Sequence, residues 1–369
     1  TGSVLKRLFG CGRQATLGLV VRYACRQRGL GVVWAAACAV AIEELWPRVF
    51  PWRFAYTQYD FLQFIQIAEL FGSAGITFLM VTCTVIFAIL LTMIFSQKVS
   101  QQYHSTLGLL AVPFVLLLTV YLWGERRLSH WQRVMEKVSG VQIGLVQIDP
   151  SYNDSLEKMR SMTQQFEQKV DLVCWPETSL DSYHFSLGDF TDEKHTRELM
   201  LPPKGNARPT AGLKCTILAG GNSHASCGTE EEGPFWPTAF LVDSQERILQ
   251  RYFKRVLMPM GEFIPLQDVF PVFREWMGLD EISKPGSDPS PLHLPDGTRV
   301  GVLMCYEDMI PRAVRESTNA GAEILVSLIN GSAFANKLAL EQHLQLARLR
   351  AIENRRSLVR CSATGVTCL

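Results

Sequence analysis

The feature that most constrains the fold of this chain is an uncharged apolar run from Gly72 to Phe95. A helix needs roughly 20 apolar residues to cross the hydrocarbon core of a bilayer, and this run is long enough. A second run, Leu107–Trp123, comes close to that length, and a shorter Ala-rich run covers residues 30–46. We therefore predict a membrane domain over residues 1–138, with spans near 30–46, 72–95 and 107–123.

The charges that flank these runs predict an orientation. A basic cluster precedes residue 30, and positive charge favours the cytoplasmic side of a membrane. Its members are Lys6, Arg7, Arg13, Arg22, Arg26 and Arg28. Three crossings then place everything after Gly124 outside the cytoplasm. Four basic residues just beyond the last span run against this rule, namely Arg126, Arg127, Arg133 and Lys137. We discount them because large domains translocate largely regardless of charge.

The pattern changes after Val141, where short apolar segments alternate with amphipathic ones. This alternation predicts an α/β domain over residues 139–369. Strands are predicted at 141–148, 171–175, 215–219, 238–242, 247–253, 300–304, 324–329 and 357–362, helices at 153–169 and 338–354, and a long loop at 181–210. The formal net charge of +1 gives no electrostatic case for nucleic acid. The ten cysteines form no Cys-x-x-Cys pair, and no His/Asp/Glu cluster suggests a metal site.

Three predicted strands end in reactive side chains, namely Glu177, Lys254 and Cys305. Cys305 falls at a predicted strand-to-helix turn, with the helix expected to continue past Pro311. Taken alone, a single cysteine in an apolar setting is more often an inert packing residue. Acyl transfer through a thioester, however, needs a thiol nucleophile, a base and a cation or dipole for the oxyanion. These three residue types supply those roles if the fold brings them together.

Three motifs carry a resemblance to a known family. They are WPET, which contains Glu177, YFKRVLMPMGEFIP, which contains Lys254 and Glu262, and GVLMCYED, which contains Cys305 and Glu307. Together they resemble the nitrilase superfamily, and the preceding membrane runs narrow the match to its membrane-bound branch, the apolipoprotein N-acyltransferase family. The resemblance implies an α-β-β-α nitrilase-like sandwich preceded by transmembrane helices.

The resemblance also implies roles for individual residues. Cys305 matches the nucleophile, Glu177 the general base and Lys254 the oxyanion stabiliser. Glu262 and Glu307 match supporting positions that orient Lys254 or Cys305. We expect no cofactor and no metal.

The implied reaction transfers an acyl chain from a membrane phospholipid, through a cysteine thioester, to the α-amine of a diacylglyceryl-apolipoprotein. Its partners are therefore the phospholipid donor, the apolipoprotein acceptor and the membrane. The implied location is the bacterial inner membrane, multi-pass, with a periplasmic catalytic domain, and we expect a monomer.

Some positions depart from the family pattern. Residues 330–334 read Asn-Gly-Ser-Ala-Phe where the family has Asn-Asp-Ala-Trp-Phe, and Ala363 replaces an Asn. The family also has more membrane helices ahead of the region that matches residue 1, and one after the catalytic domain. We therefore expect a chain that is truncated, including at its C-terminus. Two alternatives stay open: a membrane-tethered nitrilase-like amidase that hydrolyses a small amide, and an inactive membrane scaffold with this fold.

Overall fold

The computed structural model describes most of the chain after residue 30. The described residues are 15–16, 18–20, 22–23, 31–95, 103–138, 140–148, 154–180, 182–186, 208–226, 235–265, 283–332 and 336–369. The chain divides into two compact units, Thr1–Val138 and Ser139–Leu369.

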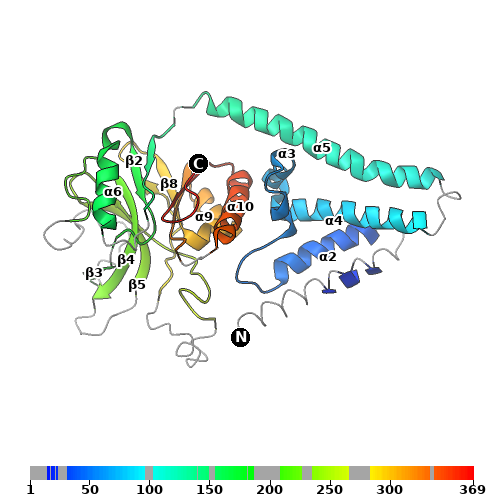
Figure 1. Ribbon diagram of the computed structural model, residues 1–369, viewed down its shortest axis with the longest axis horizontal. Helices are drawn as coiled ribbons and strands as arrows, with labels where there is room; N and C mark the ends of the chain where they lie inside the picture. Colours follow the sequence, from blue (N-terminus) through cyan, green and yellow to red (C-terminus); the bar gives the residue numbers. More distant parts are fainter. Residues whose placement is uncertain are drawn as a thin grey trace. The chain divides into compact units, whose positions relative to one another are not determined.

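The first unit is helical (Figure 1). Its long helices are α2 (Gly31–Leu45), α4 (Ala68–Phe95) and α5 (Tyr103–Met135), joined by the short helices η1 (Phe54–Gln58) and α3 (Leu62–Ile65). Small side chains let α2 lie close to α4, because Ala35, Ala36 and Ala39 pack against Val81 and Val85. Within the described residues, α4 is the one helix long and apolar enough to cross a membrane.

Two helices of this unit differ from the predicted spans. Helix α4 begins before Gly72, and at that glycine the backbone takes a non-helical conformation with φ 63°. Helix α5 continues beyond Trp123 to Met135 and so includes the basic residues Arg127 and Arg133. Arg127 donates to Glu69 at 2.5 and 2.8 Å, which joins α5 to the first turn of α4.

A buried glutamate lies in the last turn of α2. Glu43 is 2% exposed and accepts hydrogen bonds of 2.8 Å from both the Thr77 hydroxyl and the Phe54 backbone N–H. These contacts satisfy a carboxylate that would otherwise be costly to bury. They also fix the segment after α2 against α4.

The second unit contains two β-sheets. The first sheet has six strands in the order β1-β2-β4-β5-β6, with β3 paired to β4, and the second has the order β10-β9-β8-β7. The strands are β1 (Ile143–Leu145), β2 (Leu172–Trp175), β3 (Ser182–Ser186), β4 (Ile217–Ser226), β5 (Phe235–Val242), β6 (Ile248–Phe253), β7 (Leu292–His293), β8 (Arg299–Met304), β9 (Ile324–Ile329) and β10 (Leu358–Ser362). Strands β8, β9 and β10 run parallel to one another.

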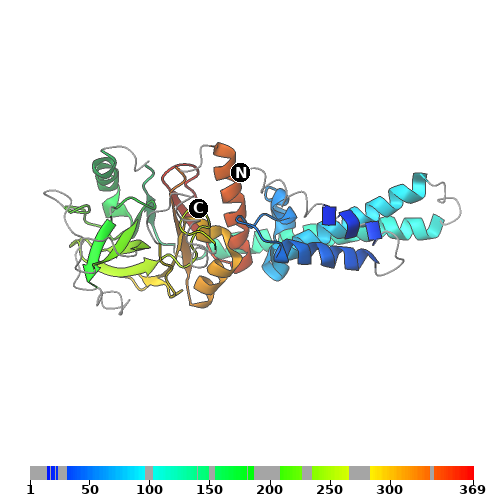
Figure 2. The ribbon, with the colours of Figure 1, turned by 90° about the horizontal axis from the view of Figure 1, so that it is seen from below.

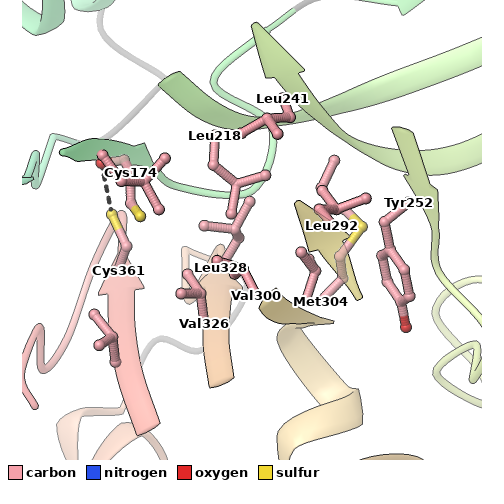
Figure 3. Packing of buried hydrophobic residues seen from close by; sticks show 14 of the residues in the cluster. Cys174, Leu218, Leu241, Tyr252, Leu292, Val300, Met304, Val326, Leu328 and Cys361 are labelled. Carbon is pink, nitrogen blue, oxygen red and sulfur yellow. Dashed lines mark hydrogen bonds between the residues drawn. The ribbon is translucent and has the colours of Figure 1, made fainter. Parts of the chain in front are cut away.

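The two sheets pack face to face through a shared apolar core. Figure 3 shows Leu218 and Leu241 of the first sheet opposite Val326 and Leu328 of the second. Alternate residues of a strand face opposite sides, so the other faces need their own cover. Helix α6 (Ser155–Gln164) covers the first sheet, and α9 (Pro311–Asn319) and α10 (Lys337–Asn354) cover the second (Figures 1 and 2). The predicted α-β-β-α sandwich is confirmed.

The structure corrects two sequence expectations in this unit. Part of the predicted loop 181–210 is strand β3, which pairs in parallel with β4; residues 187–207 lie outside the described part of the chain. The arginines of α10 were expected on a solvated or salt-bridged face; Arg350 is not solvated but fully buried, and it does form an ion pair, with Glu353 at 2.9 Å.

Candidate active site

The turn after β8 carries Cys305. Strand β8 ends at Met304, and a short 3-10 helix, η4 (Cys305–Met309), follows directly. Cys305 has φ 48°, a left-handed conformation that costs a non-glycine residue roughly 1–3 kcal/mol and is common at functional sites. The expected helix past Pro311 is interrupted, because Ile310 is extended and α9 starts anew at Pro311. A proline is well placed there, at the first position of a helix.

Glu177 lies beyond the end of β2, after Pro176. Its two oxygens have separate partners: Oε1 accepts from Lys254 Nζ at 3.2 Å, and Oε2 accepts from the Asn330 backbone N–H at 3.0 Å. The next residue, Thr178, has φ 61°, and its hydroxyl accepts from the Asn330 side chain at 2.7 Å. Asn330, at the end of β9, therefore holds both residues of this turn.

Lys254 follows β6 and is 1% exposed. Its ammonium donates to Glu177 at 3.2 Å and to Glu262 at 2.6 Å. Burial by itself would lower the pKa of Lys254, but the charges of Glu177 and Glu262 more than offset it, and the pKa is raised. The side chain therefore stays protonated at neutral pH and acts as a fixed positive charge.

Glu307 is fully buried and connects two parts of the site. It accepts hydrogen bonds from the backbone N–H groups of Met304, Arg255 and Val256 at 2.7, 2.8 and 3.0 Å, and from the Tyr252 hydroxyl. Burial raises the pKa of Glu307, and the backbone donors counteract only part of that rise. The carboxylate joins the turn that carries Cys305 to the segment that follows Lys254.

The charges around Cys305 shift the pKa of its thiol in opposite directions. Burial and then the Glu177 carboxylate raise the pKa of Cys305 well above its usual value, while Lys254 lowers it. The resting side chain is thus a protonated thiol, and it needs a base before it can attack a carbonyl. The structure joins Glu177 and Lys254 directly at 3.2 Å, and these are the charged groups with the largest effects on the pKa of the Cys305 thiol.

Three further residues around Glu177 were given no role by the sequence. Asn330 and Thr178 hold Glu177, and Gly220 of β4 lies so close that an added Cβ would be 2.6 Å from the Glu177 Cα. Of the departures at 330–334, residues 333 and 334 lie outside the described part of the chain. Among the described residues, no group of three or more His, Cys, Asp or Glu side chains could hold a metal ion.

Comparison with known families agrees with this geometry. Residues 138–368 match the carbon–nitrogen hydrolase family model, and this chain therefore belongs to that family. Residues 4–86 match the model of the apolipoprotein N-acyltransferase N-terminal domain.

Individual relatives show which branch of the family this chain resembles. The apolipoprotein N-acyltransferase of Geobacter metallireducens is 30% identical over 337 residues, which cover 87% of this chain and 60% of the relative. That of Bdellovibrio bacteriovorus is 26% identical and covers 88% of this chain and 60% of the relative. The resemblance to apolipoprotein N-acyltransferases is thus confirmed, and the chain spans about 60% of the length of these two relatives.

Among solved structures, a carbon–nitrogen hydrolase from Helicobacter pylori G27 is similar to part of this chain. It aligns with 61% of this chain and 74% of its own, at 17% identity and a TM-score of 0.41.

Proposed function

We propose that this protein is an N-acyltransferase that completes the acylation of bacterial lipoproteins. The donor is a membrane phospholipid, and the acceptor is the α-amine of the diacylglyceryl-modified N-terminal cysteine of an apolipoprotein. The observation that carries the proposal is the buried contact of 3.2 Å between Lys254 and Glu177, the two charged groups with the largest effects on the pKa of the Cys305 thiol. The relatives named above support the choice of substrates.

In the proposed first step, Cys305 attacks the ester carbonyl of the phospholipid. Glu177 takes the thiol proton, and Lys254 stabilises the oxyanion. The proton then passes from Glu177 to the leaving oxygen, which releases a lysophospholipid and leaves an acyl thioester. Glu262 and Glu307 play supporting roles, because Glu262 accepts from Lys254 and Glu307 holds the segment behind it.

In the proposed second step, the lipoprotein amine attacks the thioester carbonyl. Glu177 accepts a proton from the amine, Cys305 leaves as a thiolate, and Glu177 passes that proton to the thiolate, which restores the resting thiol and the carboxylate. The product is an amide. Water competes with the amine for the same thioester, so the site must exclude it.

We further propose that residues 1–138 form a multi-pass domain in the inner membrane and that residues 139–369 form a periplasmic catalytic domain, acting as a monomer. Large apolar side chains exposed on α4 and α5 support contact with lipid. They include Phe87, Leu91, Ile94 and Phe95 on α4, and Phe114, Val115, Leu118 and Leu122 on α5. Fusions of alkaline phosphatase and of green fluorescent protein after Leu369 test the orientation. An active phosphatase is expected, and fluorescence with an inactive phosphatase would contradict it.

The experiment that tests the reaction supplies the purified protein with a phospholipid and a synthetic diacylglyceryl-cysteine lipopeptide. Mass spectrometry should detect an N-acylated lipopeptide and one lysophospholipid for each amide formed. Free fatty acid without any N-acylated lipopeptide would instead indicate hydrolysis, as expected of a nitrilase-like amidase. Cys305→Ala is the matched control and should form neither product.

A further inference from the structure

A second acidic residue of the Cys305 turn, Asp308, has contacts that the proposed reaction does not use. Its carboxylate is fully buried. One oxygen lies 2.6 Å from His343 Nε2, and the other accepts from the Ser327 hydroxyl at 2.9 Å and lies 3.0 Å from Arg360. The three partners come from α10, β9 and β10, and all of them are buried.

Asp308 and Glu307 form hydrogen bonds with different parts of the fold. Glu307 accepts hydrogen bonds from Arg255 and Val256, in the segment after β6 of the first sheet. Asp308 instead contacts the second sheet and its covering helix. The short helix η4 is therefore held on two sides, and Cys305 at its start keeps a left-handed backbone that needs such support.

We propose that Asp308, held by His343, Ser327 and Arg360, is a positioning residue that fixes the Cys305 turn in the geometry needed for acyl transfer. This inference rests on the proposed function of Cys305. Asp308 acts through the backbone of η4 and does not touch the substrate.

The charge of Asp308 gives a way to separate positioning from electrostatics. Burial alone would raise the pKa of Asp308, but Arg360 and then His343 lower it, so the group is ionised at neutral pH. That charge in turn raises the pKa of the Cys305 thiol. If Asp308 acted only through its charge, Asp308→Asn would ease formation of the thiolate and speed acyl transfer. The positioning role predicts the opposite sign.

His343 offers a pair of variants with the same charge. His343→Gln places an amide N–H near the position of Nε2 and can still donate to Asp308, whereas His343→Leu cannot. Ser327→Ala removes a single donor and serves as a milder variant if the others fail to fold. Glu323→Gln is the control, because Glu323 pairs with Arg299 in an exposed ion pair.

The test measures kcat and KM for acyl transfer, together with amide hydrogen exchange of the peptide that contains Cys305. We expect Asp308→Asn and His343→Leu to lower kcat by about 100-fold, the scale of a 1 Å misplacement, with KM little changed. Exchange in η4 should rise in both. His343→Gln should keep kcat within about threefold of the wild type, and Glu323→Gln should change nothing.

The outcomes separate this inference from the proposed function. Wild-type kcat in folded Asp308→Asn, or an equal loss in His343→Gln and His343→Leu, would overturn the positioning role while leaving the acyltransferase intact. The opposite outcome is a wild-type protein that shows no acyl transfer, while amide hydrogen exchange in η4 is faster in Asp308→Asn than in the wild type. That result would remove the proposed function but would keep the role of Asp308 in holding the turn.

Discussion

The carboxylate of Glu307 accepts a hydrogen bond of 2.8 Å from the backbone N–H of Arg255, the residue directly after Lys254. Arg255 follows β6 of the first sheet, and Glu307 follows β8 of the second sheet. The contact therefore joins segments that leave two different sheets. This buried carboxylate therefore helps to fix the segment after the proposed oxyanion stabiliser relative to the turn that carries the proposed nucleophile.

Replacing this carboxylate tests its supporting role. Glu307→Gln keeps the size of the side chain but has one acceptor oxygen where the carboxylate has two, so a buried N–H loses its partner. We expect a loss of about 1–3 kcal/mol in the free energy of unfolding and a lower rate of acyl transfer. Urea unfolding and product formation measure the two effects. Unchanged stability and activity, as in the exposed control Glu323→Gln, would refute the role.

Lys254→Met removes the positive charge between two carboxylates. Glu177 and Glu262 lose their shared partner, and breaking a buried ion pair in this way typically costs about 3–5 kcal/mol. Lys254 also lowers the pKa of Cys305, so its loss should raise that pKa further and slow alkylation of the thiol by iodoacetamide at any given pH. Lys158→Met removes a lysine from an exposed pair and is the control. Faster alkylation in Lys254→Met would contradict the electrostatic account.

Gly220 tests how tightly Glu177 is placed. A Cβ at this position would lie 2.6 Å from the Glu177 Cα and 3.0 Å from the Pro176 carbonyl, and both are backbone atoms that cannot simply rotate away. We expect Gly220→Ala to displace Glu177 and to reduce acyl transfer by about 100-fold. Gly140→Ala has open space at its Cβ and should keep full activity. Full activity in Gly220→Ala would show that the position of Glu177 is not critical.

The lowered pKa of Asp308 predicts a dependence of stability on pH. A carboxyl group whose pKa is lower in the folded state stabilises the protein above its unfolded pKa of about 3.9, and this contribution is lost as pH falls through the folded value. The wild type should therefore be more stable than Asp308→Asn at neutral pH, and the difference should shrink below about pH 4. Urea unfolding across this range measures it. A difference that stays constant with pH would argue against an ionised Asp308.

Much of the second unit could be predicted from the sequence, because its buried parallel strands are continuous apolar runs. The structure has strand 324–329 at the residues predicted, and Cys305 occupies the predicted strand-to-helix turn. Strand β3 was missed because Ser182–Ser186 is polar and aromatic, without the apolar run of its neighbours.

The contacts around the candidate site were harder to predict. Glu307 and Asp308 are adjacent acids in the sequence, and both are fully buried with partners that come from distant parts of the chain. Asn330 acts on Glu177 through its backbone N–H, which leaves no trace in the residue type. Helix α5 continues through Arg127, whose charge is paired with Glu69.

The central claim is that Cys305 accepts the acyl chain from a phospholipid. Incubation of the purified protein with a phospholipid that carries a radiolabelled acyl chain tests it directly. The account predicts a label on the wild-type protein that hydroxylamine releases, as expected for a thioester, and none on a folded Cys305→Ala variant. A label that persists in Cys305→Ala would contradict the account.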